Sequence, residues 1–180
     1  AVTITPDGGI AATGTSRDSQ GRPHLFIQKT STAGTEQWIV TTADRSCTGN
    51  AIASAGPEGV AVLGSCTDGS GDTTLTVLED AEGRARLSKI YDLGMKTTGT
   101  ALLAPGDGGY FMVAEADTFT IGRSARDVIF RRLDSEGNVI WDRTYSGTFS
   151  SAPAAVAAAP EGGFVIAGPA VTGSSQETDI

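Results

Sequence analysis

Histidine and cysteine are scarce in this chain, which has one histidine and two cysteines among its 180 residues. His24 opens a predicted strand and has no cysteine or carboxylate motif beside it, so it gives no basis for a Ser–His–Asp triad. The chain also lacks C-x-x-C, H-E-x-x-H, G-x-S-x-G and any phosphate-binding glycine loop. These absences argue against zinc binding and catalysis, and we expect a protein that is not an enzyme.

Positive charge is in short supply as well. Thirteen Lys and Arg residues face 21 Asp and Glu residues, which gives a net charge of -8 and an isoelectric point near 4.5. Nucleic acids bind to clustered basic surfaces. Arg131 and Arg132 are adjacent on a predicted strand, so their side chains point to opposite faces and form no patch. We therefore expect no nucleic-acid partner and no binding to an anionic membrane surface.

Long apolar runs and an N-terminal leader are missing too. No apolar stretch reaches the ~18 residues that span a bilayer, so we expect no membrane insertion. The chain begins "AVTITPDGG", with neither a signal peptide nor an initiator methionine. We expect either that a leader has been removed or that the sequence is an excerpt from a longer polypeptide.

What the chain does contain is an internal repeat. Two separate landmarks recur with a period of about 50 residues, so chance is a poor explanation. The first is a glycine turn followed by an apolar strand: "TPDGGIAATG" (5–14), "GPEGVAVLG" (56–64), "GDGGYFMVA" (106–114) and "PEGGFVIAG" (160–168). The second is a glycine turn followed four residues later by a large apolar residue: Gly34 and Trp38, Gly83 and Leu87, Gly137 and Trp141.

Each unit is predicted to hold four strands, here called a to d. Strand a is short and rich in small residues (1–5, 48–55, 98–104, 151–159), and strand b is apolar on both faces (10–14, 60–66, 110–115, 164–168). Strand c alternates apolar and polar residues (24–29, 74–79, 127–133), as half-buried strands do. Strand d follows the second glycine turn (37–42, 86–91, 139–145).

Tandem four-stranded antiparallel units of this length are typical of the blades of a β-propeller. We therefore predict an all-β fold with about 3.5 repeats, in one propeller segment spanning 1–180. The predicted blades are 1–47, 48–97 and 98–150, with a partial fourth blade at 151–180. Trp38, Leu87 and Trp141 would pack between blades near the outside. The alternative is a Greek-key sandwich whose self-similarity is accidental.

The phrases "DGGYFMVA", "EGGFVIAG" and "DVIFRRLDSEGNVIWDRTY" resemble the repeats of a broad group of bacterial surface and secreted β-propeller proteins. Their units read roughly D-G-G-[YF]-[IV]-x-[AV]-G, followed by L-D-x-x-G-x-x-x-W. The resemblance covers nearly the whole chain and implies a propeller fold and a secreted, periplasmic or cell-surface location. It says little about function, because the group includes many different binding modules.

The predicted strand count is abcd, abcd, abcd, ab, and Asp179 aligns with Asp127 at the start of a strand c. Three and a half blades are too few to close a ring. The open stack that they leave would expose a large apolar blade face. Three interpretations remain. The chain is a piece of a longer propeller that stays bound to the remainder, or it pairs with a second copy of itself, or its tail improvises a fourth blade.

Cys47 and Cys66 are the only cysteines. If the hairpin between them folds about Pro57 and Glu58, the two cysteines lie diagonally opposite at its open end. An even cysteine count in a chain that looks exported favours a disulfide, whose loop would contribute roughly 3 kcal/mol. The alternative is two buried free thiols in a cytosolic protein.

Acidic residues give weaker hints. In the loop 67–73, Asp68, Ser70 and Asp72 alternate at a spacing that can surround Ca²⁺ with oxygen ligands, although the distal glutamate of a specific calcium loop is missing. The plain interpretation is a polar loop of turn-forming residues. The pairs Glu115/Asp117 and Asp134/Glu136 match a glycosidase only if their separation does, and Asp134 fits better as the residue that stabilises its own turn.

We therefore expect a non-catalytic interaction or structural module of an exported bacterial protein, without a cofactor other than calcium. It would bind a protein or a glycan through the variable b–c loops at 15–22, 67–73 and 116–126. The alternative is a fragment of a propeller hydrolase, lyase or quinoprotein whose active site lies partly in other blades.

Overall fold

The computed structural model describes residues 1–42, 45–67, 72–79, 83–92, 96–120, 123–145, 155–161, 163–168, 170–171 and 178–179. All the regular structure in these residues is strand, apart from one turn of 3₁₀ helix, η1, at Gly56–Glu58. The prediction of an all-β fold is confirmed. Among the described residues no helix has the length and apolarity needed to cross a membrane.

Three antiparallel sheets of four strands follow one another along the chain, each with its strands in sequence order. The first sheet holds β1 (Val2–Ile4), β2 (Ile10–Arg17), β3 (Pro23–Thr30) and β4 (Glu36–Thr41). The second holds β5 (Ser46–Ser54), β6 (Val60–Thr67), β7 (Asp72–Glu79) and β8 (Ala85–Tyr91). The third holds β9 (Thr97–Leu103), β10 (Tyr110–Thr120), β11 (Arg123–Leu133) and β12 (Val139–Tyr145). Each described sheet is open, with its first and last strands as edges.

The fourth unit forms two small pairs. β13 (Ala155–Ala158) pairs with β14 (Phe164–Ala167), and β15 (Ala170–Val171) pairs with β16 (Thr178–Asp179). The pair Ala170↔Asp179 stands where Ala116↔Asp127 stands in the third sheet, six residues after the start of strand b in both. The predicted alignment of Asp179 with the start of a strand c is confirmed by this register.

The repeat extends to backbone detail. Gly34, Gly83 and Gly137 take the left-handed conformation, with φ of 79°, 80° and 72°, which only glycine adopts at little cost. Each of the three c–d hairpins also carries a register shift at the same place, which falls at Thr30, Glu79 and Leu133. The turn chemistry predicted from the sequence therefore recurs three times as one local structure.

The predicted b–c loops are the main error in the strand assignment. β2 continues to Arg17, so the first of these loops shortens to 18–22. β10 and β11 pair without interruption as far as Thr120 and Arg123, so most of 116–126 is hairpin strand. Cross-strand ion pairs fasten the longer hairpin, because Arg126 lies 2.9 Å from Glu115 Oε1 and 3.3 Å from Asp117 Oδ1. Polar sequence was misread as loop where it continues a strand ladder. Residues 68–71 of the third loop lie outside the described residues.

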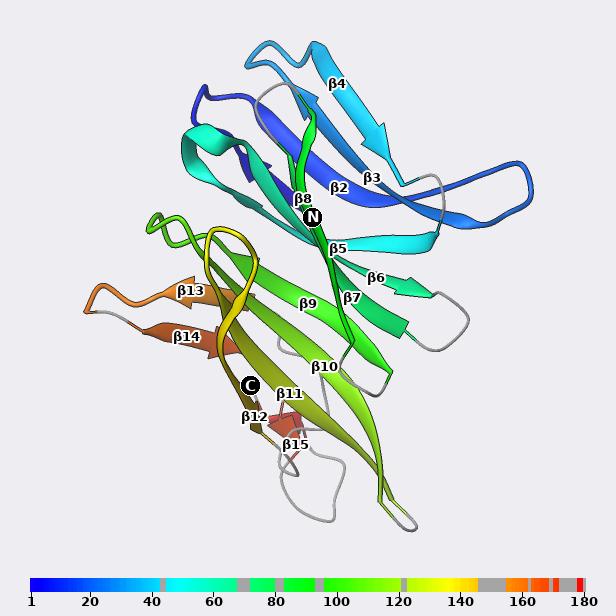
Figure 1. Ribbon diagram of the computed structural model, residues 1–180, viewed down its shortest axis with the longest axis vertical. Helices are drawn as coiled ribbons and strands as arrows, with labels where there is room; N and C mark the ends of the chain where they lie inside the picture. The colour runs from blue at the N-terminus through cyan, green and yellow to red at the C-terminus, as the bar shows by residue number, and fades with distance from the viewer. Residues whose placement is uncertain are drawn as a thin grey trace.

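The sheets pack face to face, and each interface is an apolar core. Figure 1 shows the three sheets following one another along the long axis, with β13 and β14 beside the third sheet. We call the face that each sheet turns toward the next sheet its front face, and the opposite one its rear face. The first interface joins Ala11, Leu25 and Ile27 of the first sheet to residues such as Val60 and Val62 of the second. Equivalent clusters join the second sheet to the third and the third to β13–β14.

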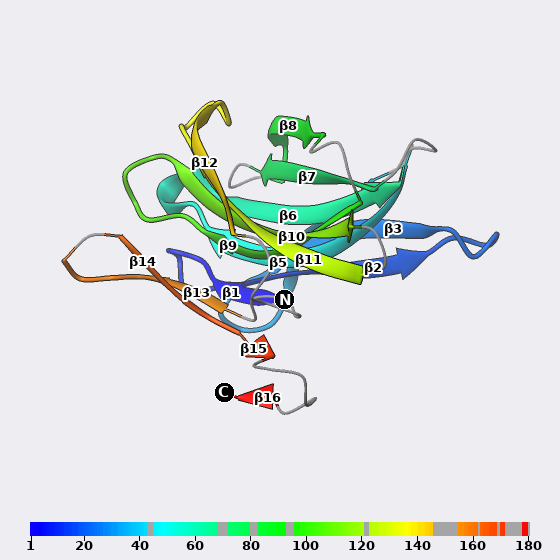
Figure 2. The same cartoon turned by 90° about the horizontal axis from the view of Figure 1, so that it is seen from below.

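The first strands of the units lie together. β5 contacts both β1 and β9, and β9 contacts β13. Figure 2 shows β1 and β13 toward one side of the molecule and the last strands β8 and β12 toward the other. The small residues of these first strands permit the close approach, since Ala51, Ala53 and Ala101 are all buried.

The large residues predicted to pack between units do so. Trp38, Leu87 and Trp141 are partly buried against the first, second and third apolar clusters respectively, and we call them the knob residues. The c–d turn of the following sheet covers the first two. A Cβ placed on Gly83 would lie 2.7 Å from Trp38 Cδ2, and one placed on Gly137 would lie 2.8 Å from Leu87 Cδ2.

Candidate binding groove between the first two sheets

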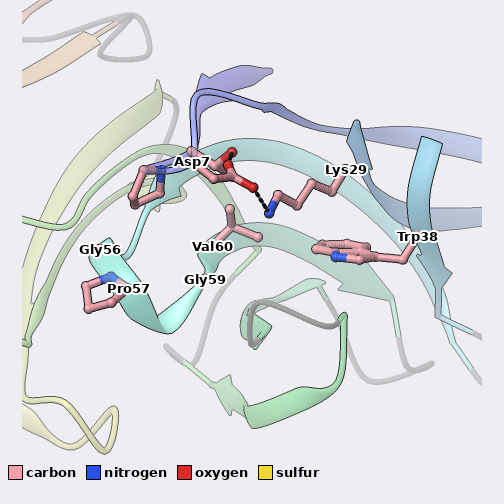
Figure 3. A pocket seen from close by; sticks show the side chains of 9 residues that line it. Asp7, Lys29, Trp38, Gly56, Pro57, Gly59 and Val60 are labelled. Atoms are coloured by element: carbon pink, nitrogen blue, oxygen red, sulfur yellow. Dashed lines mark hydrogen bonds and ion pairs between the residues drawn. The ribbon is translucent and has the colours of Figure 1, made fainter. Parts of the chain in front are cut away.

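A groove of about 200 Å³ opens where the a–b turns of the first two sheets meet (Figure 3). The turn after β1 contributes one wall, and the turn around η1 contributes the other. Strands β3 and β4 supply the floor through Lys29 and Trp38. Its lining, as far as the structure describes it, is Thr5, Pro6, Asp7, Lys29, Trp38, Gly56, Pro57, Gly59 and Val60. This described lining is mostly apolar and contains an ion pair.

That ion pair joins Asp7 to Lys29. Lys29 Nζ donates to Asp7 Oδ2 over 2.7 Å, and the Lys29 side chain is only 9% exposed, whereas that of Asp7 is 49% exposed. The other oxygen of Asp7, Oδ1, accepts hydrogen bonds from the Thr5 hydroxyl and the Gly9 amide. The hydrogen bond from Lys29, together with the other two, holds the pKa of Asp7 far below its usual range. The carboxylate therefore stays ionised and faces solvent beside the groove.

Trp38 forms the apolar side of the same arrangement. It lies directly opposite Lys29 in the β3–β4 register, so both side chains stand on the front face of the first sheet. Figure 3 shows the indole extending along the groove beside Val60, with Lys29 reaching across to Asp7. The groove thus presents an aromatic ring, two prolines and a valine next to a half-exposed carboxylate that is ion-paired with Lys29.

The third sheet repeats this arrangement. Arg132 donates through Nη2 to Asp107 Oδ2 and lies opposite Trp141, while Asp107 Oδ1 accepts from the Gly109 amide over 3.1 Å. The hydrogen bond from Arg132 is the main cause that lowers the pKa of Asp107. In the second sheet the register pairs two leucines, Leu78 and Leu87, at these positions.

A second groove, of about 240 Å³, occupies the equivalent place between the second and third sheets. Its lining, within the described part of the chain, is Ala55, Gly56, Pro57, Ala104, Gly106, Gly108, Gly109 and Tyr110, with no charged residue. The groove at Asp7 and Lys29 is therefore chemically distinct from its structural counterpart.

The two cysteines lie at the open end of the β5–β6 hairpin, away from the η1 turn that borders the groove. Their Sγ atoms are 2.15 Å apart, at disulfide distance, and both residues are buried in the first apolar cluster. The predicted pairing agrees with this, but the predicted diagonal placement is wrong, because Cys47 and Cys66 are direct neighbours across β5 and β6. The cause is a register shift between Gly49 and Ala51, which moves the open end of the hairpin by one residue.

The other sequence-predicted residues are dispersed. Asp68 and Ser70 lie outside the described residues and Asp72 begins β7, so the calcium site stays a prediction. The described residues contain no cluster of three or more His, Cys, Asp or Glu side chains that could hold a metal ion. Glu115 and Asp117 both bind Arg126, as described above.

His24 and Asp134 have structural surroundings. His24 Nδ1 lies 2.6 Å from the Thr42 carbonyl oxygen and Nε2 lies 3.3 Å from Asp18 Oδ2, so the ring ties the start of β3 to its neighbours. Asp134 Oδ1 accepts from the amides of Glu136 and Asn138, which is the turn-stabilising role predicted for it. The amide and side chain of Asn138 are the main causes that lower the pKa of Asp134.

The groove was missed by inspection of the sequence. Its signal was available as a recurring triplet, in which an aspartate of the a–b turn accompanies a cation and a tryptophan in units 1 and 3 but not in unit 2. Comparison with known proteins adds nothing to it, since no protein-family model and no curated protein matches the chain.

Proposed function

We propose that this chain is a non-catalytic interaction module of an exported bacterial protein, and that its sheets are blades of a β-propeller. Three observations support the proposal: tandem four-stranded sheets stacked face to face, first strands that lie together, and small residues where those strands meet. The cysteine pair at disulfide distance is compatible with an oxidising compartment. The resemblance to exported propeller repeats points the same way.

The groove at Asp7, Lys29 and Trp38 is the observation that carries the binding function. Its volume of about 200 Å³ is smaller than the roughly 300–1,000 Å³ typical of small-molecule sites. A space of that size accepts one side chain of an extended protein segment that lies along the seam between two sheets. The partner we propose is therefore a protein segment that inserts an anchoring side chain.

The charge of the chain indicates which side chain. The net charge of -8 draws basic partners, and the half-exposed Asp7 carboxylate lies at the mouth of the groove. A lysine or arginine can place its alkyl stem against Trp38 and Pro57 while its charged end reaches Asp7. We propose a basic protein segment as the ligand.

The b–c hairpins lie at the opposite end of the sheets from this groove, because a–b and c–d turns share one end of an antiparallel sheet. Their unequal lengths make them the place where we propose that further specificity for a protein or a glycan resides. The alternative of a propeller-enzyme fragment remains a prediction from the sequence alone.

The fluorescence of Trp38 tests the binding proposal. Trp141→Phe leaves Trp38 as the sole tryptophan, and this variant is titrated with a Lys/Arg-rich peptide, an uncharged peptide of equal length and a soluble neutral glucan. We expect the basic peptide alone to change the emission. A response only to the glucan overturns the choice of a protein ligand, and no response to any probe overturns the groove as a binding site.

A matched pair of substitutions separates the groove from general electrostatics. Asp7→Asn removes the carboxylate at the groove. Asp107→Asn removes the equivalent carboxylate of the third sheet, which is not among the described lining residues of either groove. We expect Asp7→Asn to weaken binding of the basic peptide by about fivefold and Asp107→Asn to leave it unchanged. Equal losses in both variants would mean that the peptide binds only to the overall negative charge.

A further inference from the structure

The rear face of the first sheet is mainly apolar and, among the described residues, uncovered. Val2 is 67% exposed, Ile4 72% and Ile10 47%. The β1–β2 register pairs Val2 with Ala12 and Ile4 with Ile10, so all four side chains stand on one face. Strands β3 and β4 extend this face with Phe26 and Ile39, the latter 53% exposed. The polar residues Gln28 and Thr30 of β3 stand on the same face, so the surface is mainly apolar rather than wholly so. An exposed, mainly apolar sheet face of this kind marks an interaction surface.

The equivalent residues of the other two sheets are buried. Val2 corresponds to Ile52 and Leu102, which are 8% and 7% exposed, because each pairs with strand b at the same register. Ile10 corresponds to Val60 and Tyr110, the first residues of β6 and β10, which are 1% and 2% exposed. The same positions in the repeat therefore form an interface in the second sheet, in the third sheet and, through Val156 and Phe164, in β13–β14, and are bare in the first sheet.

What covers these positions elsewhere defines what fits the bare face. Val60 and Ile52 of the second sheet are covered by Ala11, Leu25 and Ile27 from the front face of the first. Leu102 and Tyr110 of the third sheet are covered in turn by the front face of the second. The rear face of the first sheet thus has the form of a surface that receives the front face of another sheet of the same repeat.

Among the described residues, the front face of β13–β14 covers no other sheet. Val165 of β14 is 60% exposed, whereas its counterparts Ala11, Ala61 and Phe111, each the second residue of strand b, are 0%, 0% and 1% exposed. The register places Ala155, Ala157 and Ala167 on the same face of β13–β14 as Val165. All three alanines are exposed as well.

We propose that the bare rear face of the first sheet binds the bare front face of β13–β14 from a second copy of this chain, and that the reverse contact closes a pair of copies. The two faces are exposed together in one molecule, so they do not satisfy each other within it. Every buried interface of the chain joins a front face to a rear face, and the intermolecular contact follows the same rule. Such a head-to-tail contact forms a closed dimer when two copies complete the ring. The proposal is independent of the groove, which lies on the front side of the first sheet.

The mass of the purified chain in solution is the first test. Native mass spectrometry and sedimentation velocity across a wide concentration range should show a species of twice the 18.3 kDa chain mass. A monomer at every concentration overturns the proposal. A ladder of larger oligomers would show that the two faces meet without closing at two copies, which overturns the closed pair.

Three lysine substitutions of exposed apolar residues locate the contact. Ile10→Lys alters the rear face and Val165→Lys alters the front face, while Ile140→Lys on β12 alters neither, although Ile140 is 58% exposed. We expect the first two to weaken the dimer by about 100-fold or more, because each buries an unpaired charge, and the third to leave it intact. Circular dichroism of each variant verifies that it folds. If one of the two contact variants fails to fold, the other is enough for the test.

Mixing the two contact variants distinguishes head-to-tail from symmetric pairing. Each alone places its lysine in both contacts of the closed pair. A mixture of Ile10→Lys with Val165→Lys regains one unaltered contact, so a mixed dimer should form. Loss of the dimer with Ile10→Lys but not with Val165→Lys, or failure of the mixture to pair, would overturn the head-to-tail contact.

Discussion

Gly83 lies against the indole of Trp38, although 45 residues separate them in the chain. The contact joins the c–d turn of the second sheet to the knob residue of the first. Gly83 has φ of 80°, and a Cβ on it would lie 2.7 Å from Trp38 Cδ2. Glycine is therefore required at this position for two reasons: the positive φ of the backbone and the lack of space for a Cβ beside Trp38.

Gly83→Ala should destabilise the fold by more than Gly34→Ala. Both glycines have nearly the same φ, but a Cβ on Gly34 meets nothing within 4 Å. We expect about 1–2 kcal/mol for Gly34→Ala from backbone strain alone, and about 1–3 kcal/mol more for Gly83→Ala from overpacking. Urea unfolding of both variants measures the difference. Equal losses would mean that the turn moves freely away from Trp38.

Reduction of the Cys47–Cys66 pair should lower the free energy of unfolding by about 2–4 kcal/mol, since the unfolded chain then regains its loop entropy. The double variant Cys47→Ala, Cys66→Ala should unfold at the same urea concentration as the reduced wild type or somewhat lower, because it also loses buried sulfur. Thermal or urea melts with and without dithiothreitol measure the effect, and the insensitivity of the double variant to dithiothreitol is the control. Two titratable thiols in the native, unreduced protein would contradict the pairing.

Acid should destabilise the fold in part through Asp7, Asp18 and Asp107, whose pKa values are all lowered by hydrogen bonds to their charged forms. A carboxyl with a lower pKa in the folded state binds fewer protons than it does when unfolded, so stability rises with pH in that range. The contribution of these groups is complete above the unfolded value of about 3.9 and is lost as the pH falls below it.

Asp7→Asn tests this sign. The slope of the unfolding free energy against pH, measured between pH 2 and pH 5, should be smaller in the variant than in the wild type. The difference corresponds to up to one fewer proton taken up on unfolding. Asp107→Asn should reduce the slope in the same direction, because Arg132 acts on Asp107 as Lys29 acts on Asp7. An unchanged slope in Asp7→Asn would mean that its hydrogen bonds to Lys29, Thr5 and Gly9 do not persist in solution.

The strands and the repeat could be predicted because they depend on local chemistry. Gly34, Gly83 and Gly137 mark turns that no other residue forms as easily, and the apolar runs after Gly59 and Gly109 are long enough to identify buried strands. The packing of the knob residues could be predicted from the same period. A large side chain at a fixed place in each unit is expected to contact the next unit in the same way each time.

Features that depend on register or on distant partners could not be predicted in this way. The shift between Gly49 and Ala51 moves Cys47 directly opposite Cys66, and nothing in the local sequence marks it. The pairing of Asp7 with Lys29, 22 residues apart, depends on the β2–β3 hairpin closing in one register. The length of the β10–β11 hairpin depends on ion pairs across the ladder, which a reading of polar residues as loop overlooks.

The covering of each knob by the turn of the next sheet gives the array a direction. Trp38 depends on a turn of the second sheet and Leu87 on a turn of the third, so each unit is completed by the one that follows it. Damage to one unit should loosen the unit before it more than the unit after it. Folding cooperativity would then spread along the chain from C-terminus toward N-terminus, as a one-dimensional array with unequal neighbours.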